Sequence, residues 1–74
     1  MYVIVKRGER PTDVNVYSGG DTFEKAVESA FFLHAQVAEI LSSGNEYDLG
    51  YFKKCGEYTD EDDISIMICL VEQS

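Results

Sequence analysis

The chain is poor in positive charge. Its 74 residues include six lysines and arginines against 14 aspartates and glutamates, and the formal net charge at pH 7 is −8. Proteins that bind nucleic acid directly neutralise its phosphates with clustered lysine and arginine. The shortage of basic residues therefore argues against direct nucleic acid binding. The same negative charge accelerates encounter with a basic partner.

Long apolar runs are also lacking. No run approaches the roughly 18 residues of a membrane-spanning helix. The first apolar run, residues 2–5, precedes Lys6 and Arg7, which is the reverse of the order in a secretory signal. We therefore expect no membrane partner and a cytoplasmic location. With 45% apolar residues, the chain can form a packed core, and we expect residues 1–74 to be one domain.

Chemically reactive side chains are few. The two cysteines, Cys55 and Cys69, match no metal-binding spacing. Free thiols are expected for them in a cytosolic protein, with a disulfide as the alternative. The single histidine, His34, has no nucleophile or orienting acid at a recognisable spacing, and we expect a buried neutral imidazole. The sequence thus predicts no enzyme, no catalytic residue, no cofactor and no metal.

Residues 21–41 are predicted to form one amphipathic helix around which the rest is organised. Asp21 is the expected N-cap, Glu24 stands at the capping-box spacing, and Gly44 is the expected left-handed stop. At about 100° per residue, one broad face collects the apolar side chains. Its members are Phe23, Ala26, Val27, Ala30, Leu33, His34, Val37, Ile40 and Leu41.

The remaining apolar segments are predicted to be strands. Residues 2–7, 14–17 and 47–54 alternate in polarity, whereas 64–71 is apolar at nearly every position and is typical of a central strand. A short polar tail, residues 72–74, follows. The expected fold class is α+β, in the order ββαββ. The four strands form a mostly antiparallel sheet of order 2-1-4-3, in which the first and last strands are parallel neighbours. One helix packs on one face.

One helix leaves the other face of this sheet open. Alternation along 64–71 places Met67, Cys69 and Val71 away from Ile66 and Ile68. An exposed apolar patch on a monomer usually marks a contact surface. We therefore expect this face, or the edge strand beside it, to bind another copy or a partner. The alternative is a sheet that curls and buries its own side chains.

Acidic side chains mark two candidate binding surfaces. The first is the predicted loop 55–63, which carries Glu57, Asp60, Glu61, Asp62 and Asp63. Its spacing is not that of a Ca²⁺-binding loop, so a solvated loop or a partner-facing patch is favoured over a weak cation site. The second is the outer helix face, where Glu28 and Glu39 flank Phe32. An aromatic ringed by charges is typical of an interface anchor, and the alternative is an ordinary exposed apolar residue.

Residues 20–30, GDTFEKAVESA, resemble the G-D-T-x-E-E-A helix start of HicB-type antitoxins. The resemblance covers eleven of 74 residues, and that family's third strand before the helix is missing. HicB-type antitoxins are small proteins that neutralise a basic, RNA-cleaving toxin. In size and acidity the chain is also similar to small phage proteins that block host defence nucleases.

The function predicted from the sequence is that of a small acidic inhibitor. It would bind and occlude a basic, nucleic-acid-handling protein, as an antitoxin or a phage anti-defence protein does. Carboxylates on a rigid scaffold can imitate the phosphates that a basic groove binds. The alternative is a homo-oligomeric accessory domain, such as a homodimer, whose charge serves solubility only.

Overall fold

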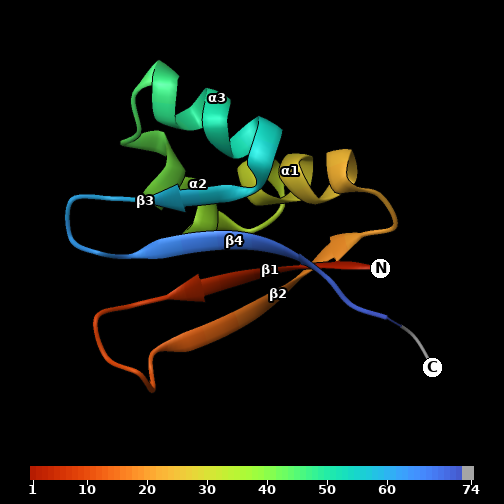
Figure 1. Ribbon diagram of the computed structural model, residues 1–74, viewed down its shortest axis with the longest axis horizontal. Coiled ribbons are helices and arrows are strands. Elements are labelled where there is room, and N and C mark those ends of the chain that lie inside the picture. Colours follow the sequence, from red (N-terminus) through yellow and green to blue (C-terminus); the bar gives the residue numbers. More distant parts are fainter. Residues whose placement is uncertain (73–74) are drawn as a thin grey trace.

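Seven elements make up the chain in the computed structural model, which describes residues 1–72. Residues 73 and 74, the end of the expected polar tail, lie outside the described residues. The order is ββαααββ (Figure 1). The elements are β1 (Tyr2–Arg7), β2 (Val14–Gly20), α1 (Phe23–Phe32), α2 (Ala35–Ser42), α3 (Glu46–Cys55), β3 (Glu57–Thr59) and β4 (Ser65–Leu70).

The α+β class and the sheet order β2-β1-β4-β3 are confirmed, with β1 and β4 in the centre. Every neighbouring pair is antiparallel. The expectation that the first and last strands run parallel was wrong, because Ile4 on β1 pairs with Ile68 on β4 in an antiparallel ladder. The expectation of one helix was also wrong: the described residues form three.

Residues 47–54 are helical rather than extended. Asn45 caps α3, because its side chain accepts a hydrogen bond from the Asp48 N–H at 2.8 Å. Acidic residues occupy the first turn of α3 and lysines the last, which suits the helix dipole. The edge strand predicted there is supplied by β3, inside the segment that we expected to be a loop. Because the edge strand is β3 and residues 47–54 form a helix instead, β4 runs antiparallel to β1 rather than parallel to it as expected.

The predicted helix 21–41 is broken at Leu33 and His34. A straight helix of that length would span about 31 Å, whereas a six-residue strand spans about 20 Å. The break lets both halves stay on the sheet, but it turns Leu33 outward, 65% exposed, rather than into the core. His34 is half-buried and tied to β2, with Nε2 2.7 Å from the Ser18 carbonyl and its ring beside Tyr17.

The predicted helix ends shift as well. Thr22, not Asp21, is the N-cap of α1, and its hydroxyl accepts a hydrogen bond from the Lys25 N–H at 3.1 Å. Ser43 ends α2 in a right-handed conformation, so Gly44 is not the left-handed stop that we expected. The left-handed glycine cap occurs one helix later, at Gly56, where φ is 76°.

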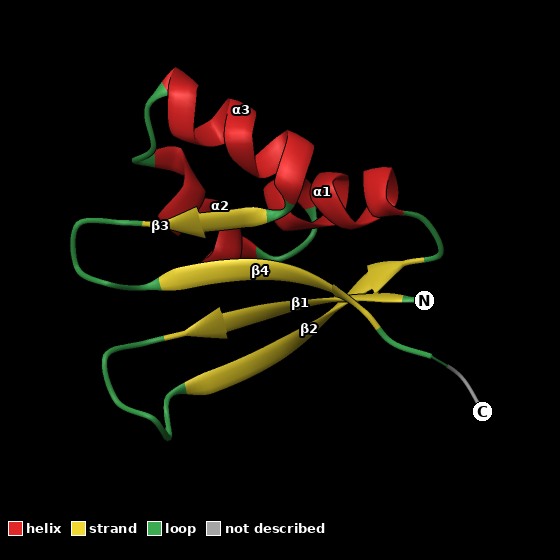
Figure 2. Cartoon of the chain, viewed as in Figure 1, coloured by secondary structure: helices red, strands yellow, loops and turns green. Residues whose placement is uncertain are grey.

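The core lies between the helices and one face of the sheet (Figure 2). Its buried members come from all three helices and from three strands: Ile4, Ala30, Val37, Leu41, Phe52, Tyr58 and Ile66. Residues of β1 and β4 that point the other way, such as Val5 and Met67, are only partly buried. On β2, Val16 is 62% exposed. The second face of the sheet is therefore uncovered.

Both cysteines are free. Cys55 is exposed at the end of α3, and Cys69 is half-buried on β4 rather than in the core. No helix within residues 1–72 is long and apolar enough to cross a membrane.

Candidate functional site

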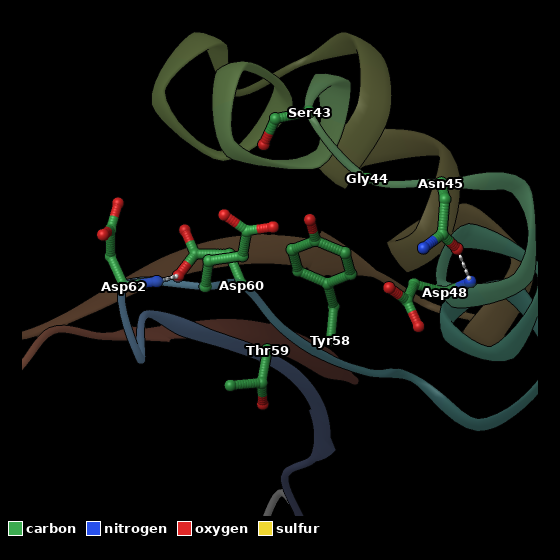
Figure 3. Close-up of a pocket in the computed structure, with 9 residues that line it drawn as sticks. Ser43, Gly44, Asn45, Asp48, Tyr58, Thr59, Asp60 and Asp62 are labelled. Carbon is green, nitrogen blue, oxygen red and sulfur yellow. Dashed lines mark hydrogen bonds between the residues drawn. The ribbon is translucent and has the colours of Figure 1, made fainter.

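The acidic loop between β3 and β4 is folded by one of its own carboxylates. Asp60 Oδ1 accepts a hydrogen bond from the Asp62 N–H at 2.9 Å (Figure 3). It accepts a second from the Ile64 N–H, also at 2.9 Å. The Asp60 N–H donates to the Ile64 carbonyl at 3.0 Å. Asp63 adopts a left-handed conformation, with φ of 61°, which aspartate tolerates better than most residues. The loop is therefore a tight turn that presents Glu61, Asp62 and Asp63 to solvent.

Asp60→Ala should destabilise the fold by about 1–2 kcal/mol, because two backbone N–H groups lose a charged acceptor. Asp62→Ala removes an exposed carboxylate that accepts no such bond, and it should change stability by less than about 0.5 kcal/mol. Urea unfolding followed by circular dichroism measures both. Equal losses in the two variants would show that Asp60 has no special role in the turn.

The loop forms one wall of an open cleft of about 610 Å³. The connection between α2 and α3 forms the opposite wall, and Tyr58 lies between the two (Figure 3). Gly44 allows this approach, since a Cβ there would lie 2.8 Å from Tyr58 Cε2. No lysine, arginine or histidine occurs among the described residues that line the cleft, which are Ser43, Gly44, Asn45, Asp48, Tyr58, Thr59, Asp60, Glu61 and Asp62.

A second hollow adjoins the cleft and shares Asp48, Tyr58 and Thr59 with it. Glu57 lines this hollow beside Tyr51. The charges of Cys55 and then Glu57 raise the pKa of the exposed Tyr51 hydroxyl above its ordinary value. We call the carboxylates around the cleft, the hollow and the turn the acidic edge: Asp48, Glu57, Asp60, Glu61, Asp62 and Asp63.

The acidic edge surrounds the cleft without converging on one point. A hard cation needs several oxygen ligands at one centre. Within residues 1–72, no group of three or more histidine, cysteine, aspartate or glutamate side chains is placed to hold a metal ion. The carboxylates are therefore spread over an extended surface rather than gathered at one centre.

The helix residues of the predicted site lie elsewhere. Glu28 and Phe32 line two hollows on α1, and Phe32 is 84% exposed. Glu39 is exposed on α2 and lines neither hollow. Lysines share this surface: Lys53 Nζ lies 5.3 Å from the Phe31 ring centroid. The two predicted acidic surfaces share no hollow. The cleft and hollow beside the loop have no basic residue in their described lining, whereas Asp62 also lines a further hollow with Lys6 and Arg10.

Sequence reasoning missed Asp48 because it placed this residue on a strand. The missed signal is the spacing of Asn45 and Asp48, in which an N-cap residue bonds the N–H three positions later. The helix turns Asp48 toward the cleft, where it faces the loop acids across the opening (Figure 3).

The resemblance to HicB-type antitoxins rests on residues 20–30, which form the end of β2, the Thr22 cap and the first turns of α1. No protein-family model, no curated protein and no solved structure matches the chain.

Proposed function

We propose that this protein is a small acidic inhibitor that binds a basic, nucleic-acid-handling protein and occludes it without catalysis. The observation that supports this function best is the acidic edge. It places several carboxylates around a cleft and an adjoining hollow whose described lining contains no basic side chain.

The backbone that carries the acidic edge is pre-organised. Asp60 is fixed by the turn that it forms, Glu57 stands on β3, and Asp48 is in the first turn of α3. Groups that are already ordered lose less conformational entropy on binding. Arginine forks bind carboxylates bidentately, much as they bind phosphates. A basic groove built for nucleic acid can therefore accept this edge, and the net charge of −8 speeds the encounter.

The second candidate function is a homo-oligomeric accessory domain whose charge serves solubility. The uncovered apolar face of the sheet, with Val16 62% exposed, favours it. On this hypothesis, neutral substitutions in the acidic edge would change the solubility of the protein but would not change its binding to any partner.

The test neutralises the part of the acidic edge that does not hold the fold together, with Glu57→Gln, Glu61→Gln, Asp62→Asn and Asp63→Asn. Immobilised protein is exposed to nuclease-treated lysate and eluted with rising salt. We expect the original chain to retain a basic protein, and the variant to bind it at least about tenfold more weakly, since each close charge pair contributes on the order of 1 kcal/mol or more.

A matched control removes four acids from the helix side: Asp21→Asn, Glu24→Gln, Glu28→Gln and Glu39→Gln. Both variants have the same net charge. The proposal requires the control to keep its affinity. An equal loss of affinity in both variants would show that only net charge matters. A loss of affinity in the control alone would show that the binding surface lies on the helices.

A further inference from the structure

Strand β2 is an unguarded edge of the sheet. It pairs with β1 on one side only (Figure 1). Natural proteins usually protect such edges with lysine, proline or a covering segment. Residues 14–20, VNVYSGG, contain no charged residue and no proline. Val14 and Val16 are 44% and 62% exposed.

The hydrogen-bond pattern shows which backbone groups of β2 are directed outward. The Gly8 N–H donates to the Asp13 carbonyl at 2.8 Å, so Gly8 and Asp13 form a hydrogen-bonded pair of the β1–β2 hairpin. Hydrogen-bonded and non-hydrogen-bonded residue pairs alternate along two antiparallel strands. Asn15 and Tyr17 therefore bond to β1. The alternate residues of β2 direct their N–H and C=O groups toward the free edge.

Those alternate residues are Val14, Val16 and Ser18, and two of their groups are already engaged. The Val14 N–H donates to the Thr12 carbonyl at 3.0 Å. The Ser18 carbonyl lies 2.7 Å from His34 Nε2. The groups left for a further strand are the Val14 carbonyl, both backbone groups of Val16, and the Ser18 N–H.

We propose that β2 pairs with β2 of a second copy, antiparallel, about a two-fold axis at Val16. The two Val16 residues exchange their N–H···O bonds. Each Ser18 N–H donates to the Val14 carbonyl of the other copy. This register uses the four available groups, and it leaves unused the two groups that Thr12 and His34 already occupy. The edge is therefore self-complementary, as a two-fold interface requires.

The charge distribution favours the same contact. Two copies of net charge −8 repel each other least where neither carries charge, and β2 carries none. Asp62 of the acidic edge comes near the start of β2, since it lines a hollow with Asn15. Lys6 and Arg10 of the same hollow offset its charge. Glu57, on β3, lies three strand spacings from β2, or about 14 Å. This exceeds the screening length of about 8 Å at physiological salt. Pairing at β2 thus joins two sheets and leaves an acidic edge at each outer end.

Exposed apolar side chains lie where the second copy would reach. Leu33 and Phe32, 65% and 84% exposed, line a hollow of about 410 Å³ with Gly19 and Gly20 at the end of β2. Pairing centred on Val16 brings the turn around Pro11 of the second copy beside these glycines. The break between α1 and α2 would then supply side-chain contact to the strand pair.

Val16→Pro tests this pairing. The Val16 N–H is directed outward, so proline removes a bond between copies and none within the sheet, and proline is tolerated on edge strands. We expect sedimentation equilibrium to show a monomer–dimer equilibrium for the original chain. The variant should bind its copy roughly tenfold to a hundredfold more weakly, because two equivalent bonds are lost. Val16→Lys, at the same exposed position, should weaken the dimer in the same direction.

Thr59→Pro is the matched control at the other free edge, on β3, and it should dimerise like the original chain. Circular dichroism checks that each variant is folded. A chain that stays monomeric at the highest attainable concentration would overturn the proposal, and so would folded Val16 variants that dimerise undiminished. The experiment uses no basic partner, so its outcome is independent of the proposed inhibitory function.

Discussion

Phe52→Ala is expected to leave the protein largely unfolded at room temperature. Phe52 is fully buried on α3, and its ring stands edge-on to Phe31 with centroids 5.7 Å apart. Truncating a buried phenylalanine costs about 3–5 kcal/mol. A core in a chain of this size supplies about 3–5 kcal/mol in total. Far-UV circular dichroism and thermal scans should therefore show loss of the cooperative transition.

Phe32→Ala is the matched control, because this neighbouring phenylalanine is exposed on α1. Its truncation should change stability by less than about 0.5 kcal/mol. If Phe52→Ala unfolded no more readily than Phe32→Ala, α3 would not be packed against the core as the structure has it.

Two glycines near α3 should respond in opposite directions to the same substitution. Gly56→Ala should destabilise by about 2–4 kcal/mol, which combines the cost of a left-handed conformation with overpacking. Its φ is 76°, and a Cβ there would lie 2.9 Å from Phe23 Cε2 and 3.1 Å from Ile68 Cβ. Gly50→Ala should stabilise by about 0.5–1 kcal/mol. Gly50 lies inside the helix, where a Cβ meets no atom within 4 Å.

Urea titrations of the two alanine variants measure this difference. The Gly50 result also tests whether residue 50 lies inside a regular element with open space at its Cβ, as α3 provides. A lower midpoint for Gly50→Ala would argue against α3.

The N-terminal hairpin and the central strand were predictable from the sequence, whereas the edge strand β3 was misplaced and the helical region was only partly predicted. The alternating N-terminal segments and the apolar run 64–71 identify the hairpin and the central strand by their side-chain pattern alone. Residues 47–54 are ambiguous: Tyr47, Leu49 and Tyr51 alternate, yet Leu49 and Phe52 have the i, i+3 spacing of a buried helix face. The break at Leu33 depends on the length of the sheet, which local sequence does not encode.

The candidate site was predictable where charge alone identifies it. Glu57 and Asp60 to Asp63 are visible as an acidic run. The sequence does not show which of these acids holds the turn together, because the two hydrogen bonds that Asp60 accepts depend on backbone geometry. Asp48 joins the site only through α3. The helix acids were predicted to form a second acidic surface, but Lys25 and Lys53 line the hollows on that surface beside Glu28.

Competition with nucleic acid for the basic partner is the decisive measurement for the proposed inhibitory function. The basic protein that the chain captures is mixed with a labelled duplex to which this basic protein binds. The acidic chain is then added in increasing amounts while the fluorescence anisotropy of the duplex is followed. We expect the duplex to be displaced completely, and the neutralised acidic-edge variant should displace it only at much higher concentration. A ternary complex, in which the duplex stays bound with unchanged affinity, would show that the chain does not occlude the nucleic-acid site of its partner.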